Sequence, residues 1–162
     1  RYTSPSMSGF NVVLASTEAA NNTGATVDGQ QLILNYSNGP IAATLLQETA
    51  SRTATAANAG DKTLGFGASY DLGVAKVMII NGKTKNPDGT VAADGSSFGV
   101  TAPMGAFKLK ASVKNDRTAT NADKQSMGVD YALSKRTRLE ANTYKTSGDA
   151  QSSYWIGVVS AF

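Results

Sequence analysis

Three lysines, Lys108, Lys110 and Lys114, fall at even positions of one segment, so an extended chain would place them on one face. A row of this kind offers charge but neither a proton carrier nor a nucleophile. The sequence contains no His and no Cys, which excludes a Ser-His-Asp triad, an imidazole base, a thiolate and His- or Cys-based zinc centres. We therefore expect electrostatic attraction of ions, with no catalytic site, no metal site and no cofactor.

The charge balance and the hydropathy narrow the class of partner. Charged residues make up 17% of the chain and the formal net charge is +3. No block of five or six like charges occurs, so we expect no nucleic acid partner. No stretch approaches the roughly 18 consecutive apolar residues of a transmembrane helix, and no leader peptide follows Arg1. We interpret the sequence as a mature product or a fragment.

The elements that position the lysines are predicted to be strands, because alternation of period two dominates the chain. In 124–133, for example, Met127, Val129 and Tyr131 alternate with small or polar residues. The alternation predicts about eleven strands, near 1–5, 9–17, 29–37, 40–49, 62–71, 73–84, 96–103, 106–116, 124–133, 136–146 and 152–162.

The predicted connections alternate between short and long. The short ones, such as 37–40 and 102–105, contain the Asn, Gly and Pro residues of tight hairpins. The long ones, such as 18–28 and 50–61, are polar. Outer-membrane barrels have short periplasmic turns and longer extracellular loops. The pattern therefore predicts an all-β, antiparallel, up-and-down transmembrane β-barrel.

Large aromatic residues provide a second indication of a membrane. They gather at the short-turn ends of the predicted strands and share the apolar face by parity, as expected for an interfacial girdle. The predicted girdle residues are Tyr2, Phe10, Tyr36, Tyr70, Phe107, Tyr131 and Phe162.

Several runs resemble the general porins of Gram-negative outer membranes, of the sixteen-stranded trimeric type. The first is Arg-Tyr-Thr-Ser-Pro at 1–5, followed by Gly-Phe at 9–10. The others are Gly-Ala-Ser-Tyr-Asp-Leu-Gly-Val-Ala-Lys at 67–76, Gly-Val-Asp-Tyr-Ala-Leu-Ser-Lys-Arg-Thr at 128–137, and Ile-Gly-Val at 156–158 with the terminal Phe162. The resemblance implies an outer-membrane porin that passes small hydrophilic solutes and ions and contacts membrane lipid and lipopolysaccharide. It also implies that Phe162 is read by the barrel-assembly machinery.

The resemblance further implies one porin domain over 1–162 that lacks N-terminal strands and the inward-folded constriction loop, because an odd number of strands does not close an antiparallel barrel. The full-length relatives form homotrimers. The strands that make most of that contact would precede Arg1, which argues against a trimer of this chain.

In such a barrel, parity places the pore-lining charges on the polar face. Basic residues outnumber acidic ones among them, which predicts a mild anion preference. The predicted pore-lining residues are Arg1, Glu48, Lys76, Lys108, Lys110, Lys114, Asp116, Asp130, Arg136, Arg138 and Glu140. The predicted lipid-facing residues are Val12, Leu14, Leu32, Leu34, Ile41, Ala43, Leu45, Val77, Ile79, Phe98, Val100, Leu109 and Val113.

Two alternatives remain open on the sequence. A non-conducting barrel could anchor the surface or bind a partner through its loops. A soluble β-sandwich that acts as a binding module would show the same alternation, with its apolar face closed into a core.

Overall fold

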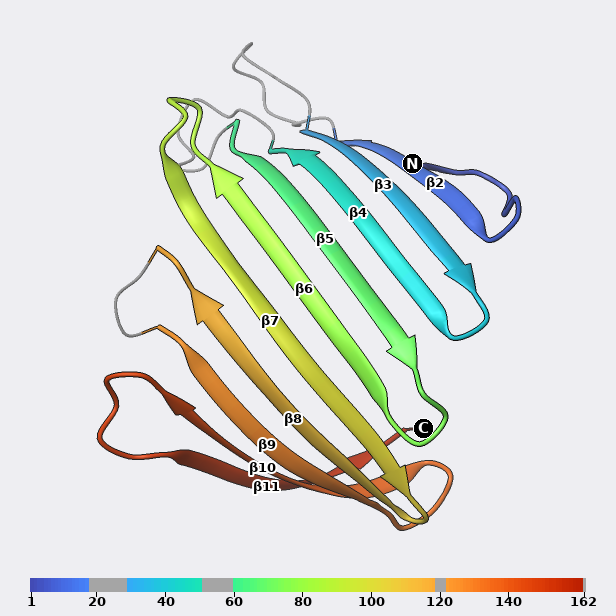
Figure 1. Cartoon of the computed structure of the whole chain (residues 1–162), viewed down its shortest axis with the longest axis vertical. Coiled ribbons are helices and arrows are strands. Elements are labelled where there is room, and N and C mark those ends of the chain that lie inside the picture. The colour runs from blue at the N-terminus through green and yellow to red at the C-terminus, as the bar shows by residue number, and fades with distance from the viewer. Residues whose placement is uncertain (18–28, 51–59, 119–121, 162) are drawn as a thin grey trace.

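The computed structural model describes residues 1–17, 29–50, 60–118 and 122–161, and these form one antiparallel sheet of eleven strands (Figure 1). Each strand pairs with its neighbours in sequence, from β1 to β11. The strands are β1 (Tyr2–Thr3), β2 (Phe10–Thr17), β3 (Gly29–Asn38), β4 (Ile41–Thr49), β5 (Lys62–Asp71), β6 (Lys76–Lys85), β7 (Val91–Met104), β8 (Phe107–Asp116), β9 (Lys124–Ala132), β10 (Thr137–Thr146) and β11 (Ser153–Ser160).

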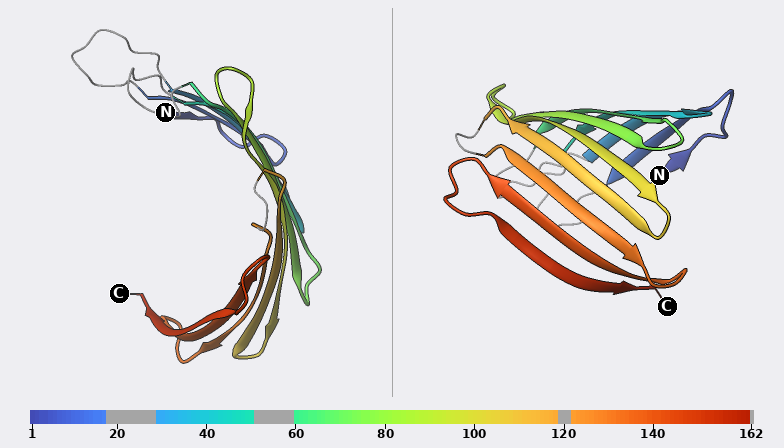
Figure 2. Two further views of the ribbon diagram at one scale, coloured as in Figure 1. Left: turned by 90° about the vertical axis from the view of Figure 1, so that its left-hand side faces the viewer. Right: turned by 60° about the horizontal axis from the view of Figure 1, so that its bottom comes forward.

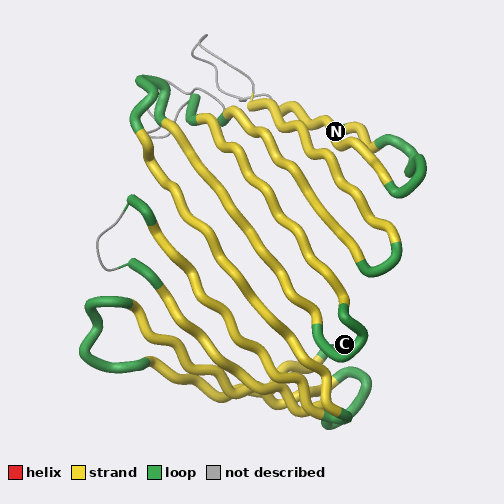
Figure 3. The backbone as a smooth tube through the Cα atoms, viewed as in Figure 1, coloured by secondary structure: helices red, strands yellow, loops and turns green. Residues whose placement is uncertain are grey.

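The sheet bends into an open arc with β1 at one end and β11 at the other (Figure 2). Strands and connecting loops make up the whole described part of the chain (Figure 3). Among the described residues, no helix has the length and apolar character needed to cross a membrane. The predicted all-β, up-and-down order is confirmed.

The strand register divides the side chains into two faces. Phe10, Tyr36 and Ala43 are successive partners, and they begin one apolar row that continues across the sheet. Val13 and Ile33 are partners on the other face, which otherwise carries mainly small and polar residues. Each predicted lipid-facing residue falls on the first face by this register.

The polar face is the concave one. The buried residues of the strands, Val13, Asp130 and Glu140, all fall on it, as expected where curvature crowds side chains together. The apolar face is convex and uncovered, with Leu45 46% exposed and Phe98 49% exposed. Among the described residues Val13 is the single buried hydrophobic side chain. A sandwich would cover this face with a second sheet, so the single layer contradicts the soluble alternative.

The predicted boundaries differ most at β7. We expected a long loop over 85–95, but β7 begins at Val91 and the connection shrinks to 86–90. Asn86 N–H donates to the Thr90 carbonyl at 2.9 Å, which closes a tight turn. An irregularity between Thr84 and Lys85 accommodates the extra residue. Because a bulge breaks the alternation locally, the pattern in 91–95 did not indicate a strand.

The first strand is also shorter than predicted, since β1 covers Tyr2–Thr3 instead of 1–5. Ser4 leaves the ladder but stays attached to β2, because its N–H donates to the Val12 carbonyl and its Oγ accepts from Val12 N–H, both at 2.9 Å. The chain then turns at Ser8 and Gly9, which both have positive φ.

Candidate functional site

Most of the predicted pore-lining charges fall on the concave face. The register places Glu48 on β4, Lys76 on β6, Lys108, Lys110, Lys114 and Asp116 on β8, Asp130 on β9, and Arg138 and Glu140 on β10. The row therefore crosses much of the sheet and is concentrated on β8 to β10.

Two predicted members lie outside the strands. Arg1 precedes β1. Arg136 lies in the turn between β9 and β10, where its N–H donates to Ser134 Oγ at 3.1 Å and its carbonyl accepts from Ala161 N–H at 2.9 Å. The predicted strand begins at 136, but β10 begins at Thr137, so parity alone did not show that Arg136 belongs to the turn.

Ion pairs neutralise three of the predicted bases. Lys110 Nζ lies 2.5 Å from Asp130 Oδ1, and Lys114 Nζ lies 3.0 Å from Asp116 Oδ2. Arg138 Nε donates to Glu140 Oε1 at 2.6 Å. Each pair joins a predicted base to a predicted acid, so the local excess of positive charge is smaller than a count along the sequence indicates.

The carboxylates of Asp130 on β9 and Glu140 on β10 are stabilised by their paired cations. Asp130 and Glu140 are register partners on one face, and each residue is 8% exposed. Like charges directly opposite each other repel, and an unpaired buried carboxylate is strongly unfavourable. Lys110 and Arg138 offset this repulsion, one from each side of the acidic pair.

Positive charge is left over at both ends of β8. Lys108 is exposed and makes no ion pair within the described part of the chain, although its register partner is Asp130. At the other end, Lys114 and Lys124 are register partners, and Lys114 is paired with Asp116. A third base, Lys76, lies opposite Asp71, whose Oδ1 accepts from Gly73 N–H.

The sequence prediction omitted Lys124, Tyr144 and Trp155 from this wall, as well as Asp71, the register partner of Lys76. Lys124 has the parity of Asp130, which was a usable signal, and its Nζ lies 5.3 Å from the ring centroid of Tyr144. Tyr144 and Trp155 also fall on the concave face, through their partners Ser126 and Asn142. The predicted pore-lining residues were all charged, so these two rings were not among them.

Four of the residues predicted to form an aromatic girdle pack against each other in two pairs. Phe10 and Tyr36 pack with centroids 4.5 Å apart, and Phe107 and Tyr131 with centroids 4.8 Å apart, at the short-turn ends of their strands. Tyr70 is at the same end of β5. The prediction placed Tyr2 at the short-turn end of its strand. Tyr2 instead pairs with Leu14, away from the turn between β1 and β2. Phe162 lies outside the described residues.

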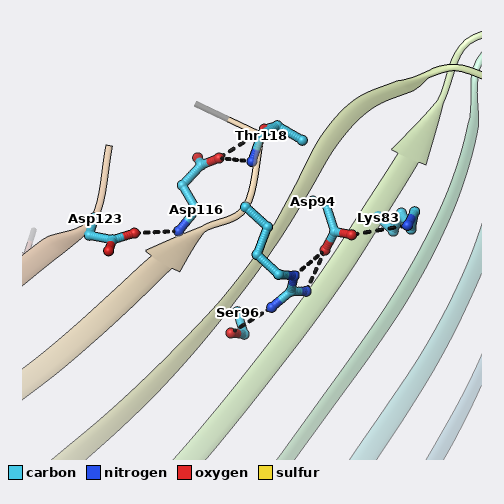
Figure 4. Close-up of polar contacts among 7 residues, drawn as sticks. Lys83, Asp94, Ser96, Asp116, Thr118 and Asp123 are labelled. Carbon is cyan, nitrogen blue, oxygen red and sulfur yellow. Dashed lines mark hydrogen bonds and ion pairs between the residues drawn. The ribbon is translucent and has the colours of Figure 1, made fainter. Parts of the chain in front are cut away.

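A second charged cluster lies on the convex face at the long-loop end (Figure 4). Asp94 Oδ2 is 3.1 Å from Lys83 Nζ, and Asp94 Oδ1 accepts from Arg117 Nε at 2.8 Å. Arg117 also donates to Ser96 Oγ at 3.2 Å. The sequence prediction placed Lys83 at the end of a strand and Asp94 in a loop, so it did not bring these residues together.

Residues 1–151 match the family model described as Gram-negative porin. The chain is 29% identical over 153 residues to outer membrane porin protein 32 of Delftia acidovorans, covering 87% of this chain and 43% of that one. A mutant of the Rh. blastica porin superposes with a TM-score of 0.77 at 17% identity, over 96% of this chain and 52% of that one. A structure described as an anion-selective porin from Comamonas acidovorans superposes with a TM-score of 0.67 at 23% identity. That match covers 99% of this chain and 54% of the other. The chain thus spans about half the length of these relatives.

Proposed function

Because the chain belongs to the Gram-negative porin family of the outer membrane, we propose that it forms part of the wall of a passive channel for small hydrophilic solutes and ions, with a mild preference for anions. The family is non-enzymatic. The observation that carries the proposal is the charge left on the concave face after ion pairing. Lys76, Lys108 and Lys124 remain there against Glu48 and Asp71, an excess of one positive charge. The solved relative described as anion-selective supports the same sign.

The positions of the surplus lysines suit ion attraction along the whole pore. Lys108 is near the short turns and Lys124 near the long loops, so each mouth of the channel carries positive charge. A unit charge about 10 Å from a passing ion in water changes its energy by about 0.4 kcal/mol. Effects of this size bias permeability by a small factor, which matches a mild preference.

The proposed pore needs a closed wall, whereas β1 and β11 are both open edges. We propose that further strands pair with these edges, since single-chain outer-membrane barrels use even strand numbers. This chain matches part of sixteen-stranded porin barrels. A constriction loop and a trimer contact on those further strands belong to the same proposal, as does docking of Phe162 on the barrel-assembly machinery.

The test is planar-bilayer conductance of the full-length protein refolded in detergent, with a salt gradient to read the reversal potential. We expect stable steps and an anion-favouring potential. Lys108→Glu and Lys124→Glu should each lower the anion-to-cation permeability ratio by a few fold, because each changes the local charge by two units. An unchanged ratio in both variants would contradict the assignment of these lysines.

A folded, membrane-inserted protein that gives no conductance steps would instead favour the non-conducting, surface-anchoring barrel. Neutral replacements, Lys108→Gln and Lys124→Gln, provide a graded control. They should produce about half the shift of the charge reversals if the effect is electrostatic.

A further inference from the structure

Two aromatic side chains face the concave side on β10 and β11, which lie side by side with β9 at one end of the sheet (Figure 1). Tyr144 pairs with Ser153 and Trp155 pairs with Asn142, so the two aromatic residues are diagonal neighbours across β10 and β11. Diagonal neighbours are about 7–8 Å apart, within reach of aromatic side chains. Tyr144 is 39% exposed and Trp155 is 45% exposed. Both rings are therefore accessible from the concave face.

The indole ring of Trp155 lies against the backbone of its own strand. A Cβ added to Gly157 would lie 2.9 Å from Trp155 Cζ3 and 3.4 Å from Trp155 Cε3. The benzene edge of the indole therefore occupies the space that a side chain at position 157 would take. No other aromatic side chain in the described part of the chain packs on this ring. The wall thus supports the indole on one side and leaves the rest of its surface open.

A positive charge lies beside the two rings. Lys124 Nζ is 5.3 Å from the ring centroid of Tyr144, a distance at which the ring attracts the ammonium group. Lys124 makes no ion pair with any residue that the structure describes, and its register partner Lys114 is already paired with Asp116. The contact with Tyr144 therefore holds one unpaired cation near the open indole ring.

The other side of the indole ring is acidic. Glu140 is the register partner of Gly157, is buried, and accepts a hydrogen bond from Arg138 Nε at 2.6 Å. An anion beside Glu140 would meet a like charge, whereas an anion beside Lys124 would meet an opposite one. A bound solute is therefore oriented with its acidic group toward Lys124 and its apolar part toward Trp155. One unpaired cation matches a solute that carries a single negative charge.

We propose that Lys124, Tyr144 and Trp155, which we call the aromatic site, form a weak binding site for aromatic monocarboxylates. The ring of the solute stacks on Trp155 with its edge toward Tyr144, and its carboxylate contacts Lys124. Stacking on an aromatic side chain and attraction to a cation act together only for a solute that has both groups. The inference rests on the proposed function, because it takes the concave face as the wall of the pore, and it adds a class of solute that this wall retains.

The test measures binding of three matched probes to the full-length protein in detergent by ligand-detected NMR titration. The first probe, 3-phenylpropionate, has a ring and a carboxylate. The second, 3-cyclohexylpropionate, keeps the charge and loses the aromatic ring, and the third, 3-phenylpropanol, keeps the ring and loses the charge. The second and third probes should each bind about threefold or more weakly than the first. Equal affinity for all three probes would overturn the proposal.

Substitutions assign the binding to these residues. Trp155→Ala should weaken binding of 3-phenylpropionate about tenfold, because it removes the stacking surface, and Trp155→Phe should restore most of the affinity. Lys124→Gln should weaken 3-phenylpropionate about threefold and leave 3-phenylpropanol unchanged. The matched control is Tyr154→Ala, since Tyr154 is adjacent in β11, lies on the convex face and is 82% exposed. An equal loss of affinity in Tyr154→Ala and Trp155→Ala would overturn the proposal.

Single-channel recordings separate this proposal from the proposed function. In the wild type, 3-phenylpropionate should interrupt the current more often than 3-cyclohexylpropionate. Normal conductance steps with equal interruption by the two probes would overturn the aromatic site and leave the channel in place. A protein without conductance steps that still prefers 3-phenylpropionate in the NMR titration would contradict the channel and support the site. Circular dichroism checks folding, and Trp155→Phe with Lys124→Gln tests the site if Trp155→Ala does not fold.

Discussion

Lys110 and Asp130 form an ion pair across β8 and β9 although they are not register partners. Lys110 Nζ lies 2.5 Å from Asp130 Oδ1, while the strand pairing sets Lys110 opposite Gly128 and Asp130 opposite Lys108. The contact is thus diagonal and passes Gly128, beside which the Asn142 side chain occupies the space that a Cβ would take. It decides which lysine of β8 remains available to ions.

The pair itself should contribute little to selectivity, because a close ion pair presents a dipole instead of a net charge. The double variant Lys110→Gln with Asp130→Asn should therefore retain the wild-type reversal potential. Lys110→Gln alone should lower the anion preference, since it leaves the Asp130 carboxylate without this partner. Single-channel recordings in a salt gradient check both outcomes, and a large shift in the double variant would contradict the pairing.

Two adjacent isoleucines of β6 test the assignment of faces. Ile79 lies on the convex face and is 45% exposed, and Ile80 lies on the concave face and is 61% exposed. Ile79→Arg should destabilise the barrel by about 2–4 kcal/mol, because it places a charge in the bilayer. Ile80→Arg should change stability by no more than about 0.5 kcal/mol. Urea unfolding in vesicles measures both, and equal values would refute the assignment.

Trp155 provides an optical test of the same assignment, because it is the single Trp of the sequence. It lies on the concave face of β11, next to Tyr154 on the convex face, which is 82% exposed. Its fluorescence should be quenched by aqueous iodide and little affected by lipids brominated on the acyl chain. In Tyr154→Trp with Trp155→Phe the two sensitivities should be exchanged.

The turn before β2 depends on Gly9. This residue has φ +88°, and a Cβ placed there would lie 2.6 Å from the Ser37 carbonyl oxygen. That same Ser37 donates its N–H to the Gly9 carbonyl at 2.8 Å, so the backbone has little freedom to move away. Gly9→Ala should destabilise the protein by about 2–3 kcal/mol.

Gly39 is the matched control for Gly9. It has φ +56° and no atom within 4 Å of an added Cβ, so Gly39→Ala should cost about 1 kcal/mol from the backbone alone. Chemical unfolding of the two variants under identical conditions gives the comparison. A larger effect at Gly39 would contradict the proposed steric cause.

Asp88 should make the 86–90 turn sensitive to acid. Hydrogen bonds from the Thr90 hydroxyl and the Thr90 N–H to Asp88 Oδ1, at 2.6 and 2.9 Å, hold the pKa of this carboxyl below its ordinary value of 3.8. The pKa of Asp88 is lower in the folded protein than its ordinary value. The carboxylate therefore contributes to the stability of the turn above pH 3.8, and this contribution is lost as the pH falls through the folded pKa. Side-chain NMR titration should show this inflection, and Thr90→Val should move it upward.

Much of the architecture is predictable because a strand repeats every two residues. The alternation in 107–116 and 124–133 placed Lys108, Asp130 and their neighbours on the correct face, and eleven strands were found as expected. The period is local, so each segment carries it independently. The β6–β7 connection was the largest exception, because its bulge removes the local signal.

The sequence by itself therefore determined the all-β order, the two faces of the sheet and the identity of most charges on the polar face. The tertiary structure alone decided which charges meet. Lys110 reaches Asp130 diagonally, and Lys83 shares Asp94 with Arg117, which directly follows a third strand, β8. These contacts depend on the register between strands and on side-chain reach, which residues distant in the chain acquire only when the sheet is assembled.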